Sequence, residues 1–362
     1  MTAYRTVEHL KASLWRAKLP TYADAIARSV KPVILFLRVQ AQDDGLPVAA
    51  SKMGGVPDLP DGFAWPTRGP YPDAAERARR ALDFARDTAA KWEKQVDGPL
   101  EPHQRRIPRE EIDRLKTAGD ARARAFGEPF PLAFVGQIDL AAMASEPGFD
   151  ADLPRTGLLS VFEDVTDSDL AETPALFWHD VPREALKRRP PPESLVAHVD
   201  LCGSYGLGQD TPWATLDMAE TLVPFSAFSV PHHWKFAFPQ GGPEWSRIWN
   251  WFQSGDGEYA PAAPDFSGHG ENPPQASYFG DRLGGWPHPI QGDVETEMDG
   301  VRITTPGKTD WRQIFAYAGE FYGGTRRMGS DGKGDGTTYH MIRADDLAAR
   351  RFEASGWTYQ MD

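Results

Sequence analysis

Short apolar runs bounded by turn residues recur along the chain and predict β-strands. The run Val33–Leu37 follows Lys31-Pro32 and contains no polar position, which is typical of a buried strand. Further runs of this kind span residues 131–140, 157–162, 195–201, 222–230, 313–318 and 337–342. Together with the helical segments described next, they predict an α+β fold whose core is a mainly antiparallel β-sheet.

Two other stretches repeat apolar residues at three- and four-residue spacing, which predicts amphipathic helices. Residues 4–29 have this pattern with a break at Leu19-Pro20, and we expect one or two short helices that form an N-terminal cover. Residues 243–252 form the second stretch, with a proline in the first turn and with Trp245 and Trp249 on one side.

Residues 73–128 differ from the rest of the chain in their density of charge. They hold 13 basic and 12 acidic residues among 56, a net charge of +1, so the remainder of the chain carries -14. A first helix, with its apolar residues along one side, is expected to end at Gly98-Pro99. A second helix is expected from about Pro108 to Phe126. We interpret residues 1–362 as a single domain that carries 73–128 as an inserted helical hairpin. The hairpin either folds back over the sheet, which we favour, or projects as a partner-binding arm.

A short pattern occurs twice and points to an internal duplication. Gly54-Gly55 precedes Val56-Pro57, and Gly284-Gly285 precedes Trp286-Pro287. Each pattern is followed by a predicted strand with a glutamine, once the hairpin is left out. This repeated pattern predicts two related β-rich halves, although paired glycines also occur wherever a tight turn needs positive φ.

The charge balance of the chain limits its partners. Its 52 acidic and 39 basic residues give a net charge of -13, which argues against a nucleic-acid binder, because phosphate contacts need a concentrated basic face. An acidic surface instead favours capture of a basic protein. We therefore expect no nucleic-acid partner and, if a protein partner exists, a basic one.

The start of the chain and its cysteine content indicate a compartment. Residues 1–19 carry charges throughout and lack the apolar region of a signal peptide, and the apolar run near the start is far shorter than the roughly 20 residues of a membrane helix. Cys202 is the only cysteine, so no internal disulfide forms, and we interpret it as a small buried side chain. We expect a cytoplasmic protein without a membrane partner.

Several segments, in order along the chain, resemble the YwqG-like family of bacterial proteins. The first is residues 51–60, Ser-Lys-Met-Gly-Gly-Val-Pro-Asp-Leu-Pro, and the second is the strand that ends in Gln137-Ile138-Asp139. The others are residues 153–162, 283–293, 334–339 and 345–352. The resemblance covers roughly residues 31–72 and 129–362. It implies an α+β fold and a bacterial cytoplasmic setting, and it brings no established activity, cofactor or catalytic residue.

The second half of the chain contains the residue types that metal sites and hydrolases use. The candidate metal ligands are His269, Glu271, His288 and His340. The candidate catalytic residues are His288, Asp293 and Glu295. Since no diagnostic spacing such as His-Glu-X-X-His is present, we expect no cofactor.

Aromatic and amide side chains form a candidate binding surface. Its members are Trp245, Trp249, Trp251, Gln137 and Gln291. The tryptophans belong either to the core, which we favour, or to a surface for a ligand or a partner. On a helix, Trp251 lies to one side of the stripe formed by Trp245 and Trp249, so it need not be buried with them. The two glutamines would hydrogen-bond strand ends or a ligand.

Two functional hypotheses follow from these patterns. The first is a non-enzymatic interaction or regulatory protein, whose acidic body binds another protein through its tryptophan-rich surface or its helical hairpin. The alternative is a hydrolase or small-ligand-binding protein that uses the His, Asp and Glu residues of the second half. The sequence does not determine the oligomeric state under either hypothesis.

Overall fold

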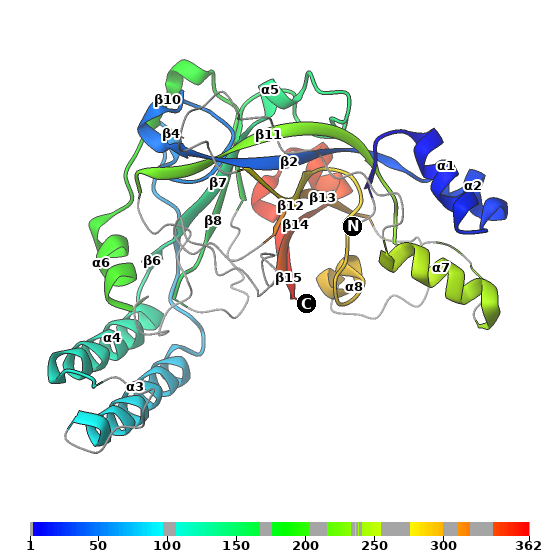
Figure 1. The fold of residues 1–362 in the computed structure, drawn as a ribbon. Coiled ribbons are helices and arrows are strands. Elements are labelled where there is room, and N and C mark those ends of the chain that lie inside the picture. Colours follow the sequence, from blue (N-terminus) through cyan, green and yellow to red (C-terminus); the bar gives the residue numbers. More distant parts are fainter. Residues whose placement is uncertain are drawn as a thin grey trace, which may run out of the picture.

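A large antiparallel sheet with helices around it forms the framework of the computed structural model (Figure 1). The structure describes residues 3–96, 106–166, 176–202, 216–232, 236, 238, 241–254, 276–299, 310–318 and 336–361. The strands of the large sheet are β1 (Ala3–Tyr4), β2 (Lys31–Gln42), β3 (Lys52–Gly54), β7 (Ala133–Asp139), β8 (Leu158–Glu163), β9 (Leu176–His179), β11 (Met218–Ser229), β12 (Ala276–Leu283), β13 (Trp311–Ala318), β14 (Gly336–Arg343) and β15 (Gly356–Met361). Two small sheets pair β4 (Asp58–Pro60) with β10 (Leu186–Arg188) and β5 (Thr67–Arg68) with β6 (Phe130–Pro131).

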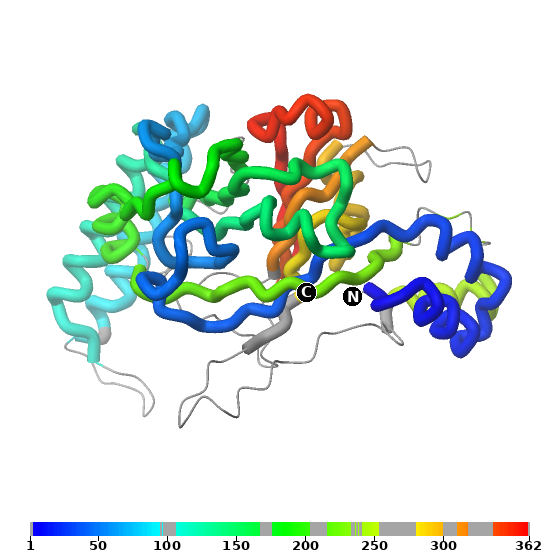
Figure 2. The backbone as a smooth tube through the Cα atoms, turned by 90° about the horizontal axis from the view of Figure 1, so that it is seen from above, coloured from blue at the N-terminus to red at the C-terminus, as the bar shows by residue number. Residues whose placement is uncertain are grey.

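The strand order of the large sheet is arranged about one central pair. β2 and β11 are antiparallel along their whole lengths, from Lys31 opposite Ser229 to Gln42 opposite Met218, and Figure 2 shows them side by side across the molecule. Outward from this pair, one wing of the sheet contains β3, β7, β8 and β9, and the other contains β12, β13, β14 and β15. The paired glycines lie at matching places, at the ends of β3 and β12, and all four have positive φ. This is the arrangement that two related halves predict.

The two wings curl toward each other. β8 and β13 are six strand spacings apart along the sheet, about 29 Å if the sheet were flat. The Tyr317 hydroxyl of β13 nevertheless donates a hydrogen bond to the Glu163 carboxylate of β8. Apolar side chains from both wings and from the central pair fill the space between the wings, among them Val161, Phe315 and Phe36. The main core is therefore inside the curl.

The predicted helices at the N-terminus and at 243–252 are confirmed. α1 (Val7–Arg16) and α2 (Pro20–Ala27) are separated at Leu19, and α7 (Gly242–Ser254) packs with them. Short helices complete the chain: α5 (Leu140–Met143), α8 (Val294–Asp299), α9 (Ala344–Ala348), and the 3-10 turns η1 (Asp43–Gly45), η2 (Arg183–Ala185) and η5 (Phe352–Ala354). In the described part of the chain, no helix combines the length and apolar character needed to span a membrane.

The prediction of a strand over 195–201 is wrong, because this segment belongs to the helix α6 (Glu193–Cys202). Short apolar runs do not distinguish a strand from a buried helix. The residues that become buried are Leu195, His198, Val199 and Cys202. Their spacing of three, four and seven positions is that of one helical face. This face packs toward the hairpin helix described next.

The charged segment forms the predicted helical hairpin, with helices α3 (Ala74–Val96) and α4 (Arg109–Gly127). α3 packs on α4, and α4 packs on α6, so the hairpin extends from one end of the molecule (Figure 1). The buried Arg68 anchors its base. Arg68 forms an ion pair with Asp164 and donates hydrogen bonds to the carbonyl oxygens of Ala125 and Glu128 at 2.9 and 3.1 Å.

Candidate functional site

Of the candidate catalytic residues near α8, Asp293 has a structural role. The Asp293 carboxylate accepts hydrogen bonds from the backbone amides of Glu295 and Thr296 at 3.0 and 3.4 Å, so it caps the start of α8. Glu295 is buried in that helix. His288 precedes the helix, its backbone carbonyl accepts a hydrogen bond from the Tyr339 hydroxyl, and desolvation lowers the pKa of its imidazole well below the usual value.

Of the four candidate metal ligands, the structure describes His288 and His340, and it does not group them with other ligands. His269 and Glu271 lie outside the described residues. His340 lies on β14 with 1% of its surface exposed, its ring centre 5.7 Å from that of Tyr317. Burial lowers its pKa to about 3, and its Nε2 atom has no hydrogen-bond partner. Among the residues that the structure describes, no group of three or more His, Cys, Asp or Glu side chains is placed to hold a metal ion.

Trp251 belongs to the core, the alternative that we favour for the tryptophans, although it lies off the stripe of Trp245 and Trp249. Only 2% of its surface is exposed, its Nε1 donates a hydrogen bond to the Ser13 hydroxyl at 2.8 Å, and its ring stacks on Tyr4. Trp245 is half-buried, whereas Trp249 is exposed. α7 packs against α1 through Trp251, while Trp249 lies on a face of the helix that is exposed.

Gln137 holds the segment 51–60 against the sheet. Its side-chain amide donates to the Ala50 carbonyl at 2.9 Å and to the Asp58 carboxylate at 2.7 Å, and its oxygen accepts from the Asp58 amide at 2.9 Å. Every polar atom of this buried side chain is thus used within the protein. Gln291 is exposed, and its backbone amide donates to the Gln360 side chain.

A buried network of charges lies beneath the same segment. The Lys52 ammonium binds the Asp43 carboxylate and the Val56 carbonyl, and the Arg188 guanidinium lies 3.3 Å from Asp58 and 3.6 Å from Asp43. Burial lowers the pKa of Lys52, and the Asp43 carboxylate opposes that shift. Two acids and two bases compensate each other, so we interpret the network as the device that fixes residues 51–60 in place.

Cys202 is confirmed as a small buried side chain. Its thiol donates to the Ala118 carbonyl at 3.5 Å and lies 3.9 Å from His198 Nδ1. Burial raises the pKa of the thiol to about 11 and lowers that of His198 to about 4. Both groups are therefore neutral at pH 7, which is the opposite of an activated cysteine-histidine pair.

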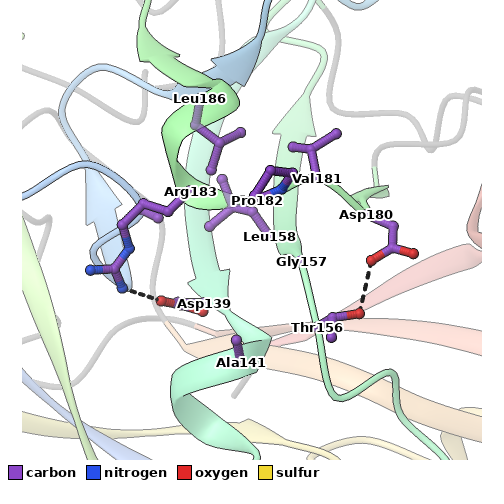
Figure 3. A pocket seen from close by; sticks show the side chains of 11 residues that line it. Asp139, Ala141, Thr156, Gly157, Leu158, Asp180, Val181, Pro182, Arg183 and Leu186 are labelled. Carbon is purple, nitrogen blue, oxygen red and sulfur yellow. Dashed lines mark hydrogen bonds and ion pairs between the residues drawn. The ribbon is translucent and has the colours of Figure 1, made fainter.

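A pocket of about 390 Å³ lies where β7, β8 and the turn after β9 meet (Figure 3). Asp139 and Arg183 form an ion pair of 2.7 Å at one side of it, and the Thr156 hydroxyl donates to Asp180 at 2.8 Å at the other. The other lining residues are Ala49, Ala141, Gly157, Leu158, Val181, Pro182 and Leu186. The sequence prediction missed this site, although its Asp139 and Thr156-Gly157-Leu158 belong to two of the segments singled out by resemblance.

The outer helix of the hairpin exposes large side chains on both of its flanks. Phe84 is 49% exposed on one flank and Leu82 is 40% exposed on the other. Arg80 and Lys91 are also exposed, four residues before and seven residues after Phe84, so the three share one face of the helix. We call Arg80, Phe84 and Lys91 the basic strip of α3.

Comparison with known proteins gives a family without an activity. A family model described as a domain of unknown function, DUF1963, matches residues 51–361. A search of curated proteins finds no match to the chain.

Proposed function

The chain belongs to this DUF1963 family of domains of unknown function, and from that membership and the geometry above we propose that it is a cytoplasmic, non-enzymatic protein-interaction module. In this proposal the basic strip of α3 binds the partner. We also propose that the chain is a YwqG-like member of the family, on the strength of the motifs at 51–60 and 137–139.

The exposure of Phe84 carries the proposal. Phe84 has 49% of its surface in water, and its helix has α4 as its main packing partner in the part of the chain that the structure describes. Its ring therefore offers apolar area that a partner can bury. Arg80 and Lys91 flank it, and both are exposed. An aromatic side chain between two cations matches an apolar pocket bordered by carboxylates.

The local charge of the strip changes the expected partner. The net charge of -13 favours a basic protein, but contacts at an interface depend on charges within a Debye length of about 8 Å. On this face of α3 these charges are Arg80 and Lys91, together with Asp87, which lies one turn from Phe84 and is paired with Arg86 at 3.7 Å. We therefore propose that the surface bound by α3 is acidic, while the acidic body of the chain orients the partner from a distance.

The test compares variants of the full chain in pull-downs from lysate, with the captured proteins quantified by mass spectrometry. Deletion of 73–128 is unsuitable, because it would expose the face of α6 that α4 covers. Phe84→Ser with Arg80→Glu should lower the amount of the specific partner at least tenfold, since an interface aromatic and a charge pair are both lost.

Leu82→Ser is the matched control, because it removes an apolar side chain of similar exposure from the opposite flank of the same helix. It should leave capture unchanged. Equal loss of the partner in both variants, or retention in both, would refute a binding surface at the basic strip.

A further inference from the structure

We propose that the pocket between β7, β8 and the turn after β9 binds a small zwitterionic molecule, with a carboxylate and an ammonium group separated by a short apolar segment. Its volume of about 390 Å³ falls in the range of small-molecule sites. The proposal concerns residues between 49 and 186 that lie outside α3, and it is independent of partner binding at α3.

Arg183 supplies the end that receives the carboxylate. Its side chain is 55% exposed, and its Nη2 atom lies 2.7 Å from a carboxylate oxygen of Asp139. Asp139 is itself only 10% exposed and also accepts a hydrogen bond from the Ala142 amide at 3.1 Å, so it fixes one edge of the guanidinium. A guanidinium has five N–H donors in a fixed plane, and one fixed contact leaves others directed at a planar oxyanion.

Asp180 supplies the end that receives the ammonium group. It is exposed at the opposite side of the pocket, where one carboxylate oxygen accepts the Thr156 hydroxyl at 2.8 Å (Figure 3). Thr156 is fixed in turn, because its carbonyl accepts the Trp178 indole N–H at 2.9 Å. An ionised carboxylate has about four acceptor positions, so this hydroxyl leaves room for an ammonium donor.

The wall between the two charged ends is apolar. Leu158 and Leu186 are buried in it, and Val181 also lines the pocket (Figure 3). Gly157 has φ of +82°, and a Cβ there would overlap the His179 carbonyl, so the turn below the pocket admits no side chain at this position. Two carboxylates and one guanidinium leave one net negative charge, which disfavours a ligand that carries a carboxylate alone.

The experiment titrates three probes of equal chain length, 6-aminohexanoate, hexanoate and hexylamine, into the full chain by ligand-observed NMR up to about 10 mM. 6-Aminohexanoate should bind with saturation and at least tenfold more tightly than either probe with a single charge. Arg183→Gln should weaken its binding at least tenfold through the carboxylate, and Asp180→Asn should do so through the ammonium group.

Lys187→Gln is the matched control, since Lys187 is a neighbouring exposed cation that pairs with Asp61 at 2.6 Å and does not line the pocket. It should bind 6-aminohexanoate as the unchanged chain does. The proposal is overturned by the absence of saturable 6-aminohexanoate binding, by hexylamine binding of equal strength, or by Arg183→Gln and Lys187→Gln having the same effect. Thermal melting of each variant checks that it is folded.

Discussion

At the scale of single residues, the segment 51–60 depends on how closely its backbone approaches Asp43. Gly55 has φ of +70°, and a Cβ at this position would overlap the Asp43 carboxylate. That carboxylate binds the Lys52 ammonium in the buried network. A side chain at residue 55 would therefore strain the backbone and also displace one partner of a buried ion pair.

Gly55→Ala is expected to lower the free energy of unfolding by about 3 kcal/mol or more, because breaking a buried ion pair adds to the backbone strain. Urea unfolding at neutral pH measures the loss. Gly62→Ala is the control, since Gly62 also has positive φ, +77°, but no atom lies within 4 Å of a Cβ there. It should cost only about 1 kcal/mol. Equal losses would show that Asp43 does not restrict residue 55.

At the scale of elements, local patterns predicted the type of most strands and helices, with 195–201 as an exception, but they did not predict which elements pack together. The runs at 222–230, 313–318 and 337–342 belong to β11, β13 and β14. The contact of β13 with β8 joins residues 154 positions apart, and no local pattern encodes it. It arises because curling the sheet buries the apolar faces of both wings at once.

The wing contact predicts an energetic coupling between Tyr317 and Glu163. In a double-mutant cycle of Tyr317→Phe and Glu163→Gln, the coupling free energy should be about 1–2 kcal/mol, because the hydroxyl donates to a charged acceptor. Urea unfolding of the four proteins measures it. The pair Tyr317→Phe and Glu184→Gln, with Glu184 in the turn η2, should show no coupling. Strict additivity of the first pair would mean that the wings do not meet at these residues.

At the scale of the whole molecule, burial of histidines makes stability depend on pH. His179 and His198 have pKa values lowered to about 4, and His340 has one lowered to about 3, in each case chiefly by burial. Below the ordinary histidine pKa of about 6.5 the unfolded chain takes up protons that the folded chain does not. Stability is therefore full above pH 6.5 and is lost as the pH falls toward 4.

Each of these histidines should lower the free energy of unfolding by about 2 kcal/mol between pH 6.5 and pH 5. Urea unfolding of the unchanged chain at pH 7.5, 6.5 and 5 measures the sum. His340→Phe should reduce the loss over this interval by about 2 kcal/mol, because its ring keeps the packing on Tyr317 without a titratable atom. A pH profile identical to that of the unchanged chain would contradict a neutral, buried His340.

The candidate site shows where inference from the sequence stops. The types of residue at 137–139 and 153–162 were recognised, but Arg183 and Asp180 carry no motif, and they reach the pocket only because β9 pairs with β8. The sequence left Trp251 between the core, which we favour, and a binding surface, and it offered Asp293 as a candidate catalytic residue. Their hydrogen bonds to Ser13 and to the start of α8 depend on which element lies opposite.

The sequence by itself determined the α+β class, the strands with continuous apolar runs, the helical hairpin at 73–128 and the repeated glycine pattern, because each is a local regularity of backbone and side-chain spacing. The tertiary structure alone decided that 193–202 is helical, that the wings curl together, and that a pocket forms between distant turns. These features depend on burial of surfaces far apart in the chain, and burial is a property of the assembled fold rather than of any one segment.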